Sequence, residues 1–279
     1  MKVLYIASIL VFLCSCQGKK DSSISPIKQE IDKEIQVPEF QTMIDSSHVR
    51  GAVLIYDLGD HKYYSNDYQW ARKGHLPAST FKIANSIIAL ETGVAESDSS
   101  LFKWNGEKRR LKTWEQDLIL KEAFHFSCVP CYQEIARKIG VKKMNQHLSK
   151  FDYGNMVVDS GNIDLFWLEG ASRISQLQQI DFLKRLYQSE LPISDRTEMI
   201  MKRMMIIENN DSLRISGKTG WSIQNDIHNG WFVGCLEIKD KAYFFATNIE
   251  STKQSDLDRF ADLRKNLTMR ALKQLKFLN

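Results

Sequence analysis

The feature that most constrains the fold of this chain is the stretch Leu76–Lys82, which runs directly into the apolar segment Ile83–Leu90. Ser79 and Lys82 lie three residues apart, and a helix places residues at this spacing on one face. The segment is apolar almost all round and stops at Gly93, so we expect a buried helix that ends there. Burial disfavours the charged form of a lysine and so lowers its pKa. The sequence therefore predicts a buried amine beside a hydroxyl.

A Ser-x-x-Lys pair of this kind can carry nucleophilic catalysis. A serine becomes a useful nucleophile only when a base lies within reach of its proton. The first turn of a helix also favours an anion, because its backbone N–H groups are free and the helix dipole is positive there. The same spacing arises by chance in many soluble helices, where the serine is a cap and the lysine reaches solvent. The apolar surroundings of Lys82 favour catalysis, because this side chain would not reach water easily.

The first residues predict export. Lys2 precedes the apolar run Val3–Leu13, which is too short to span a bilayer as a stable anchor and matches a signal peptide. Leu13–Cys16 resembles a bacterial lipobox, in which a cysteine is lipidated and becomes the first residue. We assign this role to Cys16, and the alternatives are Cys14 or plain secretion. The mature protein is then expected in the periplasm, attached to a bacterial membrane through its lipid.

The chain after the signal divides into a tether and a folded domain. We place the signal peptide at residues 1–15, a polar tether at 16–44 and the domain at 45–279. The tether is expected because the sequence from Gln17 to about Pro38 is polar and charged, with little hydrophobic periodicity.

The pattern of the domain is typical of an α/β protein of the α+β type. Strands are expected near both ends, a long amphipathic helix closes the chain, and the middle, about 95–210, is expected to be helical. The expected strands and final helix are Arg50–Tyr56, Lys62–Ser65, Leu213–Ser216, Gly230–Ile238, Tyr243–Ile249 and Gln254–Leu278. We therefore expect a central antiparallel sheet flanked by N- and C-terminal helices, with an all-helical lobe inserted. A pocket would form between the sheet and the lobe, with Ser79 at the junction.

Charge and metal-ligand patterns exclude some classes of function. The formal net charge of +4 is mild, and no dense run of Lys and Arg is interleaved with aromatic residues, so nucleic-acid binding is not expected. The histidines show no metal-binding spacing, and we expect no metal site. Cys128 and Cys131 form a Cys-x-x-Cys pair that could be a redox pair or a disulfide; we favour two small buried residues.

The segment Ser216–Trp221 supplies a second set of polar groups, at the end of an expected strand. Lys218 offers a fixed cation, Thr219 offers a hydroxyl, and Gly220 lets a ligand approach the backbone closely. A strand edge of this kind can pair with an extended acyl-amide substrate, while Lys218 attracts a carboxylate. Taken alone, the same residues could simply be a strand that turns into a loop.

The order of these motifs resembles the class D (oxacillinase-type) serine β-lactamases. The residues that carry the resemblance are Ser79–Lys82, Ser127–Val129, Tyr153–Asn155, Trp167 and Lys218–Gly220. Ser-x-x-Lys and Lys-Thr-Gly occur in serine β-lactamases and penicillin-binding proteins generally, whereas Tyr-Gly-Asn and Ser-x-Val point to class D. The resemblance covers roughly residues 45–275 and implies the serine β-lactamase and penicillin-binding-protein fold.

The resemblance implies hydrolysis of β-lactam antibiotics. Ser79 would attack the β-lactam carbonyl and form an acyl-enzyme, with the backbone N–H groups of Ser79 and Trp221 as the oxyanion hole. Lys82 would react with CO2 as the neutral amine and become a carbamate, held by the indole N–H of Trp167, that acts as the base for acylation and deacylation. Ser127 would relay a proton to the leaving nitrogen. No cofactor is implied apart from CO2 or bicarbonate for this modification.

The resemblance also implies how the substrate is held. Lys218, Thr219 and Gly220 would bind the substrate, with Lys218 and Thr219 contacting its carboxylate. Arg264 matches the carboxylate-binding arginine of the family, although Arg259 lies close by in the sequence. The remaining residues expected to line the pocket are Val129, Leu168, Tyr153 and Asn155.

One other base and two other functions stay open at this point. Glu169 could activate water, as a loop glutamate does in class A enzymes, but Trp167 fits the class D pattern and favours Lys82. A β-lactam sensor domain would acylate and stay acylated, and a penicillin-binding peptidase would deacylate slowly with water. The sequence contains no HExxH motif of the kind that sensors carry, and Tyr153–Asn155 with Trp167 argues against the peptidase.

Overall fold

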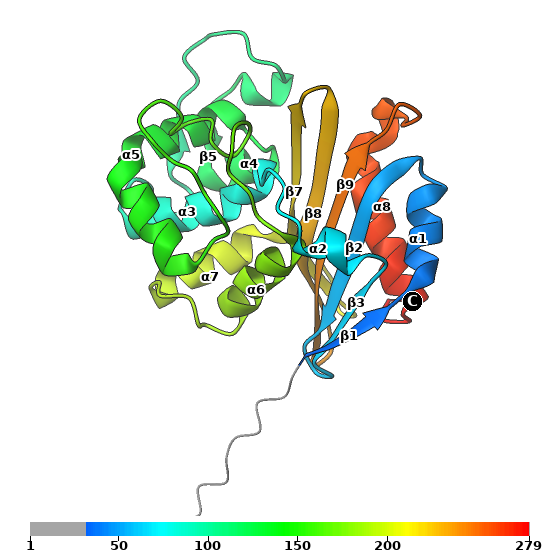
Figure 1. Cartoon of the computed structure of the whole chain (residues 1–279). Helices are drawn as coiled ribbons and strands as arrows, with labels where there is room; N and C mark the ends of the chain where they lie inside the picture. Colours follow the sequence, from blue (N-terminus) through cyan, green and yellow to red (C-terminus); the bar gives the residue numbers. More distant parts are fainter. Residues whose placement is uncertain (1–31, 279) are drawn as a thin grey trace, which may run out of the picture. The chain divides into compact units, whose positions relative to one another are not determined.

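The computed structural model of the protein describes residues 32–278. The expected signal peptide, the lipidation site Cys16 and the first part of the expected tether fall outside the described residues. Within residues 32–278, no helix combines the length and the apolar character needed to cross a membrane. The expected α/β organisation is confirmed, because a central sheet lies between two groups of helices (Figure 1).

The sheet has seven strands in the order β1-β3-β2-β9-β8-β7-β6. Their bounds are β1 Lys33–Gln36, β2 Val49–Asp57, β3 Lys62–Ser65, β6 Ile206–Asn209, β7 Arg214–Gln224, β8 Ile227–Ile238 and β9 Lys241–Ser251. All neighbouring strands are antiparallel except β1 and β3, which run parallel. The predicted antiparallel sheet is therefore confirmed, with one parallel strand added at its edge.

Strand β7 is longer than the sequence predicts. The expected strand stops at Ser216, whereas β7 continues to Gln224 because it pairs with β8 along its whole length, with Gly220 opposite Trp231. Its pairing with β6 ends at Ser216, so beyond that point β8 is its only strand partner among residues 32–278. The Lys-Thr-Gly motif consequently lies inside a strand, on an edge that no other strand of the described residues covers.

Two helices cover one face of the sheet. Helix α1 (Pro38–Asp45) packs on β2, and helix α8 (Leu257–Gln274) packs on β8 and β9 (Figure 1). Phe40 of α1 and Phe260 of α8 are fully buried in the same apolar cluster. The tether predicted at residues 16–44 is therefore wrong for its last part, because β1 and α1 already belong to the fold. Few apolar side chains in β1 and α1 are enough to hold them in the fold, because the sheet and α8 supply the other apolar side chains of the same cluster.

The other face carries the helical lobe. Its helices are α3 Lys82–Glu91, α4 Leu120–His125, α5 Val129–Phe151, α6 Gln176–Tyr187 and α7 Asp195–Met204, with the short helix α2 Tyr68–Arg72 at the sheet. The 3-10 turns η1 Ala78–Phe81 and η2 Lys112–Trp114 and the two-stranded sheet of β4 Leu101–Phe102 and β5 Leu118–Ile119 complete it. Helix α3 is buried along nearly its whole length and contacts α5 and α7. The predicted buried helix is therefore confirmed.

Candidate active site

Ser79 and Lys82 meet where the 3-10 turn η1 passes into α3. Ser79 lies in η1 and Lys82 is the first residue of α3, and the Lys82 Nζ donates a hydrogen bond of 3.0 Å to the Ser79 Oγ. Lys82 is 0% exposed, and this burial lowers its pKa to about 7. At neutral pH a large fraction of the Lys82 amine is therefore uncharged, and the lone pair that a base or a nucleophilic amine needs is present.

Aromatic rings surround this amine. The Lys82 Nζ lies 5.0 Å from the centre of the Tyr132 ring, and the neighbouring Phe81 stacks on Trp167 with ring centres 5.4 Å apart. The backbone N–H of Ala78 donates to the carbonyl of Trp167 at 2.8 Å, which ties the loop of Trp167 to the turn that carries Ser79. These contacts explain why water is excluded and the pKa of Lys82 is low.

The indole nitrogen of Trp167 is an unsatisfied donor. Trp167 is fully buried, and its Nε1 has no hydrogen-bond partner among the described residues. Most buried polar groups in proteins have a partner, so an orphaned donor indicates a group that the polypeptide alone does not supply. An indole N–H can only donate, so that group must be an acceptor.

Ser127 and Lys218 form a second hydroxyl–amine pair. The Lys218 Nζ donates hydrogen bonds to the Ser127 Oγ and, at 3.0 Å, to the carbonyl of Thr219. Burial lowers the pKa of Lys218 well below its ordinary value, and the nearby charges of Lys82 and Arg264 lower it further. The sequence predicts Lys218 as a carboxylate ligand only. Its contact with Ser127 joins residues 91 positions apart, so no local sequence pattern predicts it.

The open edge of β7 lies directly against the turn of Ser79. A side-chain carbon at Gly220 would lie 3.1 Å from the carbonyl oxygen of Pro77 and 3.2 Å from the backbone nitrogen of Ser79. This close approach explains the glycine, as the sequence predicts for a backbone that a ligand must reach. Arg264 of α8 donates to the carbonyl of Gly220 and lies against the Trp221 ring, 5.8 Å from its centre. Burial lowers the pKa of Arg264 to about 10.

A cleft of about 800 Å³ brings most of the predicted residues together. The predicted residues that line it are Ser79, Ser127, Val129, Leu168, Glu169, Thr219, Gly220, Trp221 and Arg264. Lys82 and Trp167 are fully buried beside Ser79. Arg264 lines this cleft and Arg259 does not, which separates the two arginines that the sequence leaves open.

Two predicted pocket residues do not line the cleft. Tyr153 is buried, with its ring 5.9 Å from that of Phe81 and 4.8 Å from that of Phe182. Asn155 exchanges backbone hydrogen bonds with Arg173. The Tyr-Gly-Asn segment therefore packs against Phe81 and pairs with the chain that follows Trp167, and it does not face the cleft. Sequence order cannot distinguish a residue in a pocket from one that packs beneath its wall.

The prediction of two separate buried thiols at Cys128 and Cys131 is wrong. The two residues form a disulfide, and Cys128 is the N-cap residue of α5. A helix brings residues three positions apart onto one face, so the first turn of α5 places the two sulfur atoms together. The disulfide follows Ser127 directly, and among the described residues Cys235 is the free cysteine.

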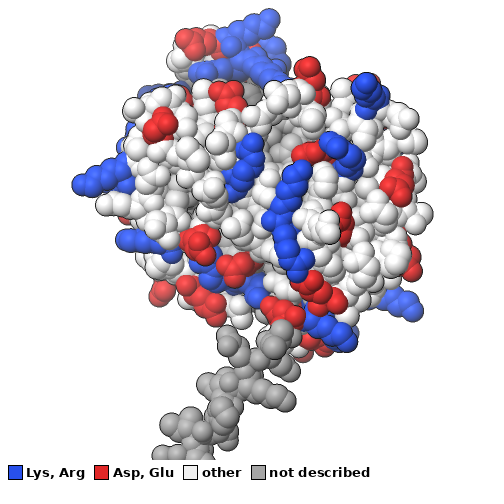
Figure 2. All heavy atoms as spheres, viewed as in Figure 1, with Lys and Arg blue, Asp and Glu red and all other residues white. Residues whose placement is uncertain are grey.

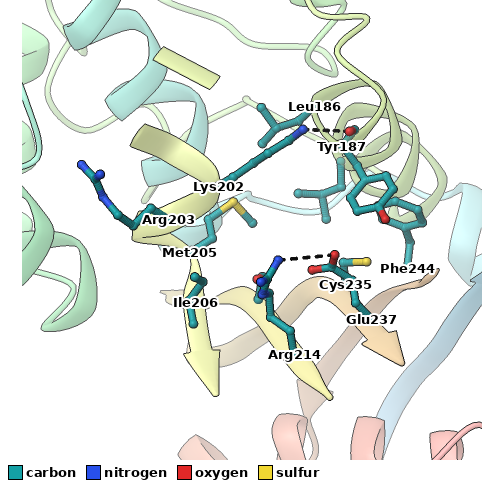
Figure 3. Close-up of a pocket in the computed structure, with 12 residues that line it drawn as sticks. Leu186, Tyr187, Lys202, Arg203, Met205, Ile206, Arg214, Cys235, Glu237 and Phe244 are labelled. Carbon is teal, nitrogen blue, oxygen red and sulfur yellow. Dashed lines mark hydrogen bonds and ion pairs between the residues drawn. The ribbon is translucent and has the colours of Figure 1, made fainter. Parts of the chain in front are cut away.

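A second cavity of about 560 Å³ lies between the helical lobe and the sheet (Figure 3). Lys202 of α7 and Arg214 of β7 point toward it, but Lys202 donates to the carbonyl of Tyr187 and Arg214 lies 3.7 Å from Glu237. None of the predicted catalytic residues lines this cavity. Across residues 32–278, no group of three or more His, Cys, Asp or Glu side chains is arranged to hold a metal ion.

One part of the cleft wall is not predicted from the sequence. Lys108, Arg109 and Arg110 lie between β4 and η2 and line the cleft together with His125 and Phe126. The run of three cations is visible in the sequence, but its place in the wall of the cleft that Ser79 also lines depends on the tertiary fold.

Comparisons with known proteins agree with this geometry. Residues 48–268 match a family model described as the penicillin binding protein transpeptidase domain. The chain is 41% identical over 229 residues to β-lactamase OXA-48 of Klebsiella pneumoniae, which covers 82% of this chain and 84% of that protein. It is 41% identical over 212 residues to β-lactamase OXA-10 of Pseudomonas aeruginosa, covering 75% of this chain and 79% of that protein.

Solved structures give the same result. The crystal structure of a class D β-lactamase from Sebaldella termitidis matches 89% of this chain and 100% of that chain, with a TM-score of 0.84 and 34% identity. A class D β-lactamase from Nostoc matches 86% of this chain and 99% of that chain, with a TM-score of 0.81 and 41% identity. With the Ser-x-x-Lys and Lys-Thr-Gly residues gathered at one cleft, this chain is a member of the class D serine β-lactamases.

Proposed function

We propose that this enzyme hydrolyses β-lactam antibiotics through an acyl-enzyme on Ser79, with Lys82 modified by CO2 to an N-carboxylated lysine. The observation that carries the proposal is the fully buried Lys82 amine, whose pKa is lowered to about 7 and whose Nζ lies 3.0 Å from the Ser79 Oγ. CO2 reacts only with an uncharged amine: the nitrogen lone pair attacks the carbon and the amine loses a proton. A lysine with its ordinary pKa would be almost fully protonated at neutral pH.

The residues around Lys82 fit such a modification. It adds a carboxylate to the side chain, which needs a donor in a site that excludes water. The indole N–H of Trp167 is buried and has no partner among the described residues, so it is free to donate to one of the added oxygens. Phe81 stacks on the Trp167 ring and holds it in place. The N-carboxylated lysine supplies the general base that accepts the Ser79 proton and later a proton from the hydrolytic water.

The other groups bind and orient the substrate. The Ser79 oxygen attacks the β-lactam carbonyl, and the backbone N–H groups of Ser79 and Trp221 donate to the oxyanion, a contribution worth roughly two to three orders of magnitude per donor. The close packing of Gly220 on the Ser79 backbone supports this oxyanion hole. Gly220 directly precedes Trp221, so the backbone that carries the Trp221 N–H lies near the backbone nitrogen of Ser79. Because Lys218 donates to the Ser127 oxygen, the Ser127 hydroxyl hydrogen can point at the leaving nitrogen.

Cations on the sheet side of the cleft suit the substrate carboxylate. Arg264 is 8% exposed, lines the cleft and forms no ion pair within residues 32–278, and Thr219 offers a hydroxyl beside it. A buried cation without an opposite charge beside it is costly. We assign the ring carboxylate of the β-lactam to Thr219, Lys218 and Arg264. Glu169 also lines the cleft, but the hydrogen bond from Lys82 to Ser79 supports Lys82 as the base.

Turnover of a chromogenic cephalosporin tests the proposal. The purified mature protein is expected to hydrolyse many equivalents at pH 7, and to be faster with added bicarbonate than in a buffer stripped of CO2. One equivalent of product followed by no further reaction would favour a β-lactam sensor, and cleavage of D-Ala-D-Ala peptides would favour a penicillin-binding peptidase. A rate that does not depend on bicarbonate, together with no carbon-13 signal from labelled CO2 on Lys82, would contradict the modification.

We also propose that the protein is exported and lipidated at Cys16. The basic Lys2, the apolar run Val3–Leu13 and the cysteine that follows it support this. In a bacterial host, Cys16→Ser is expected to move the protein from the membrane fraction to the soluble fraction, whereas Cys14→Ser should leave it with the membranes. The opposite result would assign the lipid to Cys14, and a soluble unaltered protein would indicate plain secretion.

A further inference from the structure

One wall of the catalytic cleft is cationic, and the proposed hydrolysis of a simple β-lactam does not use it. Lys108, Arg109 and Arg110 are consecutive and line the cleft together with Ser79. They lie on the loop between β4 and η2, the loop at the top of Figure 1, and Figure 2 shows Lys and Arg side chains gathered there. Among the described residues that line the cleft, Glu169 is the only acid.

Two of these cations are available to a ligand. Arg109 donates to the side chain of Asn105 at 2.8 Å and lies 3.9 Å from Glu107. Lys108 and Arg110 are exposed and form no ion pair or side-chain hydrogen bond with residues 32–278, and the charge of Lys108 acts only from a distance on Glu115, whose pKa is lowered mainly by Lys112. Charges that face a partly enclosed cleft attract an anionic substrate, because the low-dielectric walls concentrate their field.

The two sides of the cleft then have separate roles. Thr219 and Arg264 approach from the sheet and α8, where the proposed function places the carboxylate of the β-lactam ring system. Lys108 and Arg110 come from the helical lobe, on the loop between β4 and η2. A substrate with one carboxylate satisfies only the first set of cations. The second set fits another anionic group on the acyl side chain of the same substrate.

We propose that Lys108 and Arg110 make this enzyme select β-lactams whose acyl side chain bears a second carboxylate. The inference rests on the proposed function and adds a substrate class to it. Such a charge pair is partly exposed and screened by salt, so each cation contributes modestly, up to about fivefold. Their effect is expected mainly on kcat/KM, because electrostatic attraction speeds the encounter of the enzyme with its substrate.

A matched pair of penicillins tests this selection. Carboxybenzylpenicillin and benzylpenicillin differ by one carboxylate on the acyl side chain. For the variant Lys108→Gln/Arg110→Gln, the ratio of their kcat/KM values is expected to fall by about fivefold or more relative to the unaltered enzyme. Benzylpenicillin itself should change by less than about twofold. High salt should lower the ratio in the unaltered enzyme and have little effect in the double variant, because the Debye length shrinks.

Lys112→Gln is the matched control. Lys112 is the first residue of η2, directly after this loop, and is equally cationic, but it does not line the cleft and is paired with Glu115 at 2.6 Å. For Lys112→Gln, the ratio of the kcat/KM values for the two penicillins is expected to match that of the unaltered enzyme. A fall in this ratio as large as in the double variant would overturn the inference. Normal benzylpenicillin kinetics in the double variant show that it is folded.

The result also separates this inference from the proposed function. If both penicillins are hydrolysed and the double variant leaves their ratio unchanged, the selection by Lys108 and Arg110 is wrong and the proposed function stands. If neither penicillin is hydrolysed but both acylate Ser79, the proposed hydrolysis is wrong. The ratio of the two acylation rates, compared between the unaltered enzyme and the double variant, then tests the selection by Lys108 and Arg110. If neither acylates Ser79, both proposals are overturned.

Discussion

Replacing Lys82 with methionine is expected to lower kcat/KM for a chromogenic cephalosporin by about a thousandfold or more. The Lys82 Nζ is the group hydrogen-bonded to the Ser79 Oγ, at 3.0 Å, and methionine keeps the size of the side chain while removing the nitrogen. Without a base, Ser79 loses its activation and the acyl-enzyme that still forms cannot be hydrolysed. Mass spectrometry of the intact protein should therefore show substrate bound to Ser79 at times when the unaltered enzyme is free.

The control for this variant is another lysine. Lys138 lies on α5 and pairs with Glu134 at 2.6 Å on the surface, so Lys138→Met is expected to leave turnover unchanged. Added bicarbonate should speed the unaltered enzyme and leave Lys82→Met inactive. If Lys82→Met retained more than about a tenth of the turnover rate, the role of Lys82 as base would be wrong, and Glu169 would become the next residue to replace.

The same variant should make the protein more stable, in a way that depends on pH. The pKa of Lys82 falls from an ordinary 10.5 to about 7 on folding. Between these values the unfolded chain binds more protons than the folded one, so the stability of the unaltered enzyme rises with pH in that range. The burial penalty is complete below about pH 7 and disappears above about pH 10.5. Its full size corresponds to roughly 5 kcal/mol.

Urea unfolding in buffer stripped of CO2 measures this effect. At pH 6, Lys82→Met is expected to have a free energy of unfolding about 5 kcal/mol higher than the unaltered enzyme. The difference should shrink steadily as the pH rises from 7 to 10. A difference of the same size at every pH would show that better packing of methionine, and not the buried charge, is responsible. Lys138→Met should show no such difference at any pH.

This pairing of lost activity with gained stability follows from where Lys82 lies. A buried amine destabilises the folded protein because it loses its hydration. The same loss of hydration leaves the amine uncharged near neutral pH, which makes it a base or a nucleophile toward CO2. Active sites often retain groups of this kind at the expense of stability.

Much of the core of the site follows from local sequence. The run Ile83–Leu90 forms a buried helix because it is apolar almost all round, and the spacing of Ser79 and Lys82 then fixes their contact. The strand at Lys62–Ser65 also follows from local pattern and turn residues. These features depend on residues close together in the chain, whose geometry a single turn or helix sets.

Other expectations fail because the deciding partner is remote in sequence. Strand β7 continues past Ser216 because β8 pairs with it. The last part of the predicted tether forms β1 and α1 because the sheet offers them an edge and a face. Tyr153 lies beneath Phe81 rather than in the cleft, and local pattern cannot reveal this.

By itself, the sequence determined the pairing of Ser79 with the Lys82 amine, the order of the motifs, and hence membership of the class D β-lactamases. Only the tertiary structure decided that Lys218 donates to Ser127, that Arg264 rather than Arg259 reaches the cleft, and that Lys108 and Arg110 line its other wall. The physical reason is that covalent spacing controls contacts within a turn of helix. Contacts between residues a hundred positions apart depend on how the sheet and the helical lobe bury their apolar faces together.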